Sequence, residues 1–324
     1  MVNSDKLIAA YILDGKGGGQ KVEWNEIRQW TPQDGLLWVH LNFKAPEAQQ
    51  WIREESQLDD VIGDVLLAEE SRPRVTAFED GLLVALRGVN LNPGEHPEDM
   101  VSLRIWAEKD RIITTRRRKL LSVADLQSAI EEGKGPKTAG EFLDDVADRL
   151  MSRMGGVIDG LGDRVAELEE AVLTEESYEL RPKLASIRRE AIHLRRYMAP
   201  QREALARLQS EKLSWLTNED SVRLRESYDR LTRYLEDLDA ARERSAVTQE
   251  ELVSRLSEQM NNRMYVLSII AAIFLPLGFL TGLLGINLGG IPGAEYKAGF
   301  AIFCLVLVVV LVAEIVIFKK KKWM

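Results

Sequence analysis

Two long apolar segments near the C-terminal end dominate the hydropathy pattern of this chain. Residues 264–284 contain no charged side chain, and residues 298–318 contain one, Glu314. Each segment has 21 residues, and a helix of that length crosses a hydrocarbon core of about 30 Å. We therefore predict two transmembrane helices. The alternative, two buried helices of a water-soluble core, fits poorly with the four consecutive lysines that follow the second segment.

The charges around these segments predict their orientation. Residues 263–324 carry six basic and two acidic side chains, a net of +4, which leaves −12 for residues 1–262 because the whole chain has −8. Basic residues flank the pair of segments, whereas residues 285–297 between them hold one acid and one base. We expect both termini on the cytoplasmic side of a bacterial-type inner membrane, with the loop outside. The acidic body argues against nucleic acid as a partner.

The first third of the chain has short apolar or alternating runs bounded by Gly, Asp and Asn, a pattern that predicts strands. These runs are residues 6–15, 36–43, 81–91, 100–108 and 110–118. Residues 46–51 and 58–67 have helical spacing instead. The order of the elements predicts a sheet with helices packed on it.

The chain becomes helical from about Lys119. Residues 141–173 and 178–208 have apolar positions at three- and four-residue spacing, with Pro200 as a predicted kink. Residues 219–275 contain neither Pro nor Gly and follow a capping cluster that begins at Thr217. A continuous helix over 219–284 would be about 99 Å long. A helix of that length needs partner helices.

These patterns predict an α+β membrane protein: an N-terminal cytoplasmic α/β domain, then a long helical stalk continuous with the first of two transmembrane helices. The predicted divisions are a cytoplasmic α/β and helical domain at 1–215, a stalk helix at 216–263, the first transmembrane helix at 264–284, an external loop at 285–297, the second transmembrane helix at 298–318 and a basic cytoplasmic tail at 319–324.

The first span has two different faces. Two helices cannot enclose a water-filled passage, so the hairpin is either an anchor or one part of a larger assembly. One face consists of Asn261, Met264, Ser268, Ala271, Leu275, Gly278 and Gly282, which are small, polar or flexible apart from Met264 and Leu275. The opposite face is aliphatic: Val266, Ile270, Ile273, Leu277, Leu280 and Leu284. The small face suits a narrow channel or close helix packing without a pore, and the aliphatic face suits lipid.

The loop after the first span is rich in glycine and contains one amide side chain. Its glycines permit a sharp turn at the membrane surface. Asn287 offers uncharged dipoles, and a ring of such groups could hold a hydrated cation weakly enough to release it. A plain flexible turn is the alternative.

At these residues the sequence resembles the CorA family of divalent-cation channels and transporters. The family's Gly-x-Asn tripeptide corresponds to Gly285-Ile286-Asn287, and the stretches "YVLSIIAAIFLPLGFLTGLLGIN" and "FKKKKWM" fit its pattern. Ile286 departs from the Met usual in the magnesium branch. The stretches "NLGGIPG", "ESRPRV", "EEGKGP" and "RRYMAPQR" look like the zinc-transporting ZntB branch.

The resemblance implies a funnel-shaped homopentamer in which the long helix lines a central pore and the second span forms an outer ring. The implied pore-lining positions are Asn261, Met264, Leu267, Ala271, Leu275, Gly278 and Asn287, with Ser268 competing with Leu267 for one layer and Gly282 added by the spacing. Met264, Leu267 and Leu275 would form an apolar constriction. Gly278 departs from the polar residue common in magnesium channels. Asn287 would contact the hydrated cation through its water.

The resemblance implies transport of zinc, and of other divalent cations, across the inner membrane, with uptake as the expected direction and proton coupling as an option. A magnesium, cobalt or nickel channel is the alternative within the family. From another class, the chain could be a membrane-anchored cytoplasmic scaffold or sensor. The predicted partners are further copies of the chain, the lipid bilayer and divalent metal ions. We expect no cofactor. The sequence contains no nucleophile–base arrangement, so we do not expect an enzyme.

A few other residues have side chains that could bind metal or protons. His40, His96 and His193 have no ligand spacing, and Cys304 has no His near it in the spans, so zinc would have to pass largely hydrated. Glu314 is expected to pair with a lysine at the end of the second span, and a role in proton coupling is the alternative.

Two further predictions concern the long helix and the acidic residues. Pro276 removes one backbone hydrogen bond inside the first span and is a possible hinge. The acidic sets, including Asp144-Asp145-Asp148, are expected to be solvated helix faces. Attraction of cations or regulatory binding at subunit interfaces is the alternative.

Overall fold

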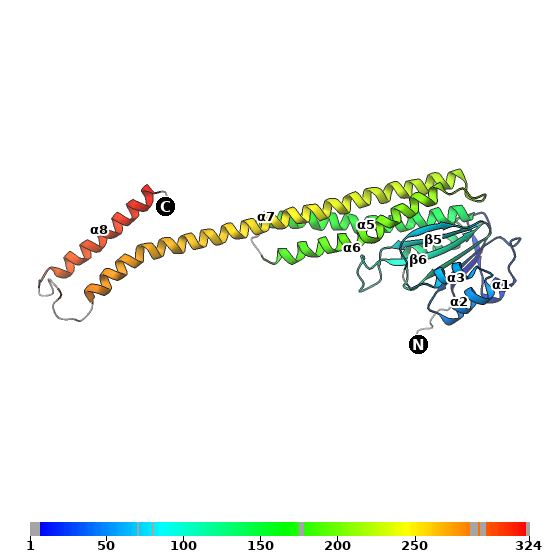
Figure 1. Cartoon of the computed structure of the whole chain (residues 1–324), viewed down its shortest axis with the longest axis horizontal. Coiled ribbons are helices and arrows are strands. Elements are labelled where there is room, and N and C mark those ends of the chain that lie inside the picture. The colour runs from blue at the N-terminus through cyan, green and yellow to red at the C-terminus, as the bar shows by residue number, and fades with distance from the viewer. Residues whose placement is uncertain are drawn as a thin grey trace. The chain divides into compact units, whose positions relative to one another are not determined.

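A computed structural model of the chain describes residues 7–69, 71–79, 81–174, 178–285, 291 and 296–321. The chain divides into two compact units, Met1–Glu250 and Glu251–Met324. Figure 1 shows a mixed sheet with its helices in the first unit and a pair of helices in the second.

The first unit is built on one seven-stranded sheet with the order β2-β1-β3-β7-β6-β5-β4. The strands are β1 (Leu7–Leu13), β2 (Gly19–Lys21), β3 (Leu36–Asn42), β4 (Arg74–Ala77), β5 (Gly81–Gly88), β6 (Val101–Glu108) and β7 (Arg111–Arg116). Only the pairing of β3 with β7 is parallel among the strand pairs described. All five predicted strands are confirmed. The short outer strands β2 and β4 were missed because they have three and four residues and little apolar pattern.

Helices cover both faces of the sheet. The helices of the first unit are α1 (Trp24–Gln29), α2 (Pro46–Gln50), α3 (Asp60–Leu67), α4 (Leu121–Glu131), α5 (Ala139–Thr174) and α6 (Leu180–Ser210), with a π-helical turn at Trp51–Glu55. On one face, Leu41 and Ile113 share a buried cluster with Ile62 and Leu66 of α3. On the other face, Trp38 packs edge-on against Phe142 of α5 with ring centroids 5.1 Å apart. The predicted sheet with helices packed on it is confirmed.

The helices α5 and α6 and the first part of α7 (Asn218–Gly285) share one apolar core with the sheet. Leu161, Leu194, Leu231 and Leu238 are all buried in it. The helix α6 runs through Pro200 without interruption. The predicted helices over 141–173 and 178–208 are therefore confirmed, and Pro200 does not end the second one.

A reciprocal cap starts α7. The Asp220 amide donates to Thr217 Oγ1 at 3.2 Å, and the Thr217 amide donates to Asp220 Oδ2 at 2.8 Å. This is a capping box, with aspartate in the acidic position. From there α7 continues as one helix of 68 residues to Gly285, so the predicted continuous helix over 219–284 is confirmed.

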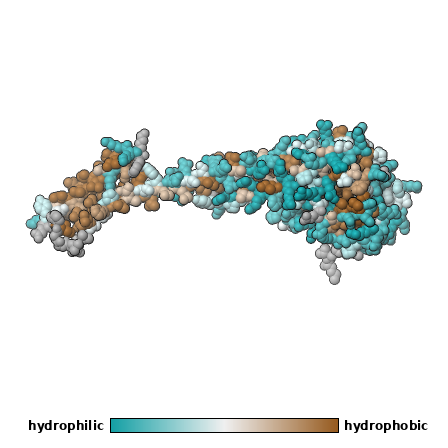
Figure 2. Space-filling model, viewed as in Figure 1, coloured by the Kyte–Doolittle hydropathy of each residue, from teal (hydrophilic) through white to brown (hydrophobic). Residues whose placement is uncertain are grey.

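The second unit contains the end of α7 and the helix α8 (Gly299–Lys320). Both helices are long and apolar enough to cross a membrane. Figure 2 shows hydrophobic residues gathered on this unit, in contrast to the mostly hydrophilic surface seen on the first.

Candidate ion-conduction site

The predicted pore-lining face of α7 is open within a single chain. Asn261, Met264, Leu267, Ser268, Ala271, Leu275, Gly278 and Gly282 are all exposed. Leu275, the most exposed of the three large side chains on this face, is 73% exposed. The described part of this chain therefore leaves the small-residue face uncovered.

The glycines on this face are not required by packing within the chain. A Cβ atom added at Gly278, Gly282 or Gly285 would meet nothing within 4 Å. At Gly155 of α5, by contrast, a Cβ atom would lie 2.5 Å from the Tyr234 hydroxyl. Small residues at a transmembrane helix surface allow close approach of another helix, so these glycines fit a surface that meets something outside the chain.

The opposite side of α7 is partly covered. Its half-buried residues are Ile269, Ile273, Pro276, Leu277 and Leu280. The half-buried residues of α8 also form one stripe: Phe303, Cys304, Leu307, Val310, Leu311, Glu314, Ile315 and Phe318. One residue of each stripe, Leu280 of α7 and Phe303 of α8, lines the same pocket.

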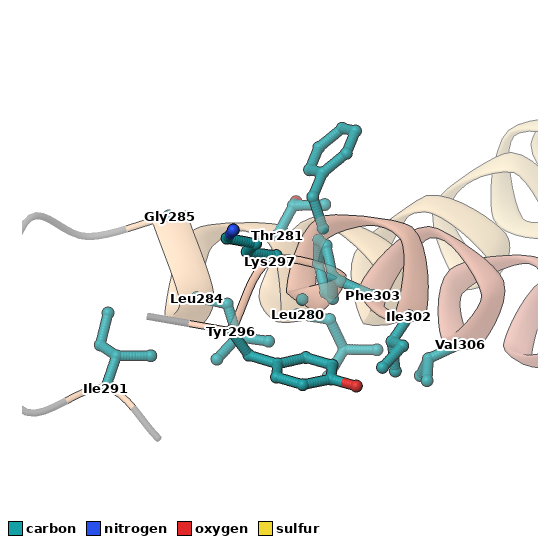
Figure 3. Close-up of a pocket in the computed structure, with 12 residues that line it drawn as sticks. Leu280, Thr281, Leu284, Gly285, Ile291, Tyr296, Lys297, Ile302, Phe303 and Val306 are labelled. Atoms are coloured by element: carbon teal, nitrogen blue, oxygen red, sulfur yellow. The ribbon is translucent and has the colours of Figure 1, made fainter. Parts of the chain in front are cut away.

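This arrangement corrects one expectation. Figure 3 shows Leu280 and Leu284 of α7 on the same pocket as Phe303 and Val306 of α8. The pocket has a volume of about 740 Å³, and Tyr296 and Lys297 also line it. The aliphatic face of the first span is thus turned partly toward the second span and not wholly toward lipid.

The hydroxyl groups of the first span bond to its own backbone. Ser268 Oγ donates to the Met264 carbonyl at 2.8 Å, and Thr281 Oγ1 donates to the Leu277 carbonyl at 2.9 Å. Each hydroxyl oxygen keeps lone pairs that can accept from water. Ser268 can therefore face hydrated ions only as an acceptor while this bond is made.

The Gly-x-Asn tripeptide is described only at its first residue. Gly285 is the last residue of α7, while Ile286 and Asn287 lie outside the described residues. The predicted role of Asn287 toward a hydrated cation therefore stays a prediction.

No site for a dehydrated metal ion is found in the described part of the chain. No group of three or more His, Cys, Asp or Glu residues there could hold a metal. His40 lies buried in β3, where Arg116 Nε donates to its Nε2 at 2.9 Å. Burial lowers the pKa of His40 well below its usual value, so the ring is neutral. This histidine has a structural role.

Two acidic groups differ from the sequence prediction. Asp144, expected on a solvated face, is buried between α5 and the start of α7, and burial raises its pKa to about 7. Glu314 does not pair with Lys319 or Lys320, and its Oε2 is buried without a hydrogen-bond partner among the described residues. Lys319 is five residues further along, which places it about 140° around the helix from Glu314.

Comparison with known proteins places this geometry in a family. The family model of CorA, described as CorA-like Mg²⁺ transporter protein, matches residues 33–320. The "Divalent cation transporter CmaX" of Pseudomonas aeruginosa is 44% identical over 322 residues, covering 98% of this chain and 97% of that protein. The "Zinc transport protein ZntB" of Yersinia pseudotuberculosis is 38% identical over 317 residues, covering 98% and 96%.

A solved structure has the same fold over the whole length. The structure of the full-length CmaX protein matches with a TM-score of 0.86 at 43% identity and covers 100% of both chains. The resemblance drawn from the Gly-x-Asn tripeptide and its flanking spans is therefore confirmed. This chain belongs to the CorA family of CorA-like Mg²⁺ transporter proteins.

Proposed function

We propose that this protein is a homopentamer that conducts divalent cations, zinc among them, across the inner membrane through a pore lined by its α7 helices. The observation that carries the proposal is the exposed small-residue face of α7, which leads directly to Gly285 of the Gly-x-Asn tripeptide. A helical hairpin that served only as a membrane anchor would not need a face of small residues directly before the Gly-x-Asn tripeptide.

Several copies are needed to complete the site. A single hairpin leaves Met264, Leu267 and Leu275 at 63%, 66% and 73% exposure on one side of the span. Repetition of that side around an axis would place rings of these apolar side chains along the passage. Narrow apolar rings exclude water and so close a pore without a mechanical plug. These three residues form the proposed gate.

The cation passes largely hydrated. The described residues hold no cluster of three metal ligands, and a zinc ion stripped of water requires about four N, S or O donors. Asn261, Ser268 and the proposed Asn287 ring offer neutral polar groups that can bind the water shell of the ion. Such weak binding permits release after capture.

Zinc is favoured over magnesium by similarity. The chain is 38% identical to proteins named zinc transport protein ZntB, and Gly278 and Ile286 depart from the magnesium-branch pattern. With both termini in the cytoplasm, the membrane potential would drive a divalent cation inward by about 4.6 kcal/mol per 100 mV. Uptake is the proposed direction.

Flux into liposomes tests this function. Zinc entry is measured for the wild type, for Asn287→Ala and for Asn262→Ala, a matched amide substitution outside the set of predicted pore-lining residues. We expect Asn287→Ala to lower zinc flux at least about tenfold, and Asn262→Ala to leave it unchanged. Equal entry in all three would remove Asn287 from its role.

Two other outcomes are informative. Magnesium entry in the absence of zinc entry would favour the magnesium, cobalt or nickel alternative. If no divalent cation enters, the alternative of a membrane-anchored cytoplasmic scaffold or sensor would be favoured over a pore. Imposing a proton gradient in the same assay separates a passive channel from a proton-coupled carrier.

A further inference from the structure

The pocket between α7 and α8 has apolar walls. Leu280 and Leu284 line it from α7, and Phe303 and Val306 line it from α8, around a volume of about 740 Å³. The only hydroxyl group on the two helical walls belongs to Thr281, and it donates to a carbonyl of its own helix. These walls offer water too few hydrogen-bond partners to hold it in place. They suit an apolar occupant.

The pocket is open toward the surroundings of the hairpin. Phe300, Ile302 and Val306 line it and are 81%, 51% and 44% exposed. The wall contributed by α8 runs from Gly299 to Val306, which is about 10 Å along a helix. One leaflet supplies about 15 Å of a hydrocarbon core of about 30 Å. The pocket is therefore as deep as the upper two thirds of one acyl chain.

The polar groups of the pocket gather at one end. Tyr296 and Lys297 line it just before α8 begins, and Figure 3 shows them toward the Gly285 end, with Val306 at the other. In the described part of the chain, neither the Tyr296 hydroxyl nor the Lys297 ammonium has a hydrogen bond or an ion pair. The N-cap residue Ala298 gives α8 no side-chain cap, so the positive end of the helix dipole adds to the lysine charge. This end of the pocket suits an anion.

Another copy of the chain would bring no described anion to this level. In a symmetric assembly the same ends of α7 and α8 would meet the pocket, and residues 264–285 contain no acid. The acid of α8, Glu314, lies about 22 Å further along the helix than Gly299. Glu295 lies outside the described residues. A lipid phosphate, by contrast, lies at the membrane surface, where Tyr and Lys side chains are typical.

We infer that this pocket binds one anionic phospholipid. One acyl chain lies between Leu280 of α7 and Phe303 of α8. The phosphate pairs with the Lys297 ammonium and accepts a hydrogen bond from the Tyr296 hydroxyl. A zwitterionic lipid carries a cation of its own in the headgroup, so a lipid of net negative charge is preferred. The lipid site does not rest on the proposed function, because it needs only the hairpin in a bilayer.

Native mass spectrometry of the full chain, released from detergent with added lipid, tests the headgroup contact. The probes are phosphatidylglycerol, which is anionic, and phosphatidylcholine with the same acyl chains. We expect Lys297→Gln to bind phosphatidylglycerol about fivefold more weakly than the wild type, the effect of one cationic side chain near an anionic headgroup, and to bind phosphatidylcholine equally well. Lys297→Arg keeps the charge and should match the wild type. The lysines after α8 are present in every variant and cancel in the comparison.

A second pair of variants tests the acyl-chain part of the pocket. Val306→Trp places a large ring in the pocket, so we expect both lipids to bind about fivefold more weakly or worse, because each CH₂ group that leaves an apolar site lowers the affinity. Val308 is an exposed residue of α8 that does not line the pocket. Val308→Trp should therefore bind both lipids as the wild type does.

Two results would overturn the inference. If Lys297→Gln, a change at an exposed residue outside the helices, binds both lipids like the wild type, then no phosphate is held at this end of the pocket. If Val306→Trp breaks the oligomer in the same spectra and leaves lipid binding unchanged, then another copy of the chain occupies the pocket.

Discussion

Asp144 of α5 and Arg223 of α7 approach each other only to 3.9 Å, between Oδ2 and Nη1. The Arg223 guanidinium is held more closely by Glu219, at 2.6 Å. Asp144 is therefore a buried carboxyl with a weak counter-ion, and burial and its acidic neighbours raise its pKa to about 7, with Arg223 acting in the opposite direction. It sits where the long helix α7 begins.

Asp144 should make the protein less stable as pH rises. The folded state holds this proton more tightly than the unfolded chain, whose carboxyl titrates near pH 4. The cost of ionising Asp144 therefore grows from about pH 4 and is complete above about pH 7. Asp144→Asn should be more stable than the wild type by roughly 2 kcal/mol at about pH 8, and the difference should vanish near pH 4.

Thermal unfolding of the full chain in detergent, followed by circular dichroism at several pH values, measures this effect. Asp163→Asn, at an exposed position of the same helix, serves as the control and should follow the wild type. A melting temperature for Asp144→Asn below that of the wild type at high pH would show that the carboxylate is stabilising.

Adjacent glycines of α5 give a matched pair of substitutions. A Cβ atom at Gly155 would lie 2.5 Å from the Tyr234 hydroxyl of α7, whereas one at Gly156 would meet nothing within 4 Å. Gly155→Ala should lower the free energy of unfolding by about 1–3 kcal/mol, because the added methyl group overpacks the contact with Tyr234. Gly156→Ala should raise the free energy of unfolding by about 0.5–1 kcal/mol, because alanine is the better helix former.

The same unfolding measurement distinguishes these two substitutions. Adding Tyr234→Phe to Gly155→Ala removes the hydroxyl oxygen and should recover part of the loss. Equal melting temperatures for Gly155→Ala and Gly156→Ala would mean that α5 and α7 can separate at this point without cost.

Secondary structure was largely predictable because its signals are local. The apolar run of β5, the partly alternating run of β6 and the three- and four-residue spacing of α5 each reflect burial within one element. The start of α7 was equally clear, because Thr217 and Asp220 satisfy backbone groups three residues apart. The strand β2 was missed because three mostly polar residues carry no pattern.

Contacts between distant elements were not predictable. Asp144 reads as part of an acidic face, and only the packing of α5 against α7 buries it. The covering of Leu277 and Leu280 by α8 depends on how the hairpin closes, about which helical periodicity says nothing. The small-residue face of α7, by contrast, is visible in the sequence, because it is defined by one helix alone.

Gly278 provides a test of that face. A leucine there meets no atom of the same chain within 4 Å at its Cβ, so Gly278→Leu should fold like the wild type. Repeated around a pore, the same side chains would narrow it, and we expect zinc flux to fall at least about tenfold. Val266→Leu, at an exposed position of the aliphatic face, should leave flux unchanged.

Melting temperature and liposome flux together separate the possible results for Gly278→Leu. Normal stability with normal flux would mean that Gly278 faces lipid, and the proposed pore face would then be wrong. Lost oligomer with normal monomer folding would instead indicate tight packing between copies at this position.

Pro276 lies on the half-buried stripe of α7, inside an otherwise continuous helix. Proline has no amide hydrogen, so the carbonyl of Ala272 lacks its usual helical partner and the helix can bend there at lower cost. Pro276→Ala supplies the missing donor and should stiffen the span. If the pore opens by bending α7 at this point, zinc flux in liposomes should change by about threefold or more, with no loss of thermal stability.

Val266→Ala, which alters a side chain of the same span but no backbone bond, is the control. Flux kinetics identical to those of the wild type in Pro276→Ala would mean that gating does not use this bend, and that the proposed gate at Met264, Leu267 and Leu275 opens by rotation or separation of straight helices.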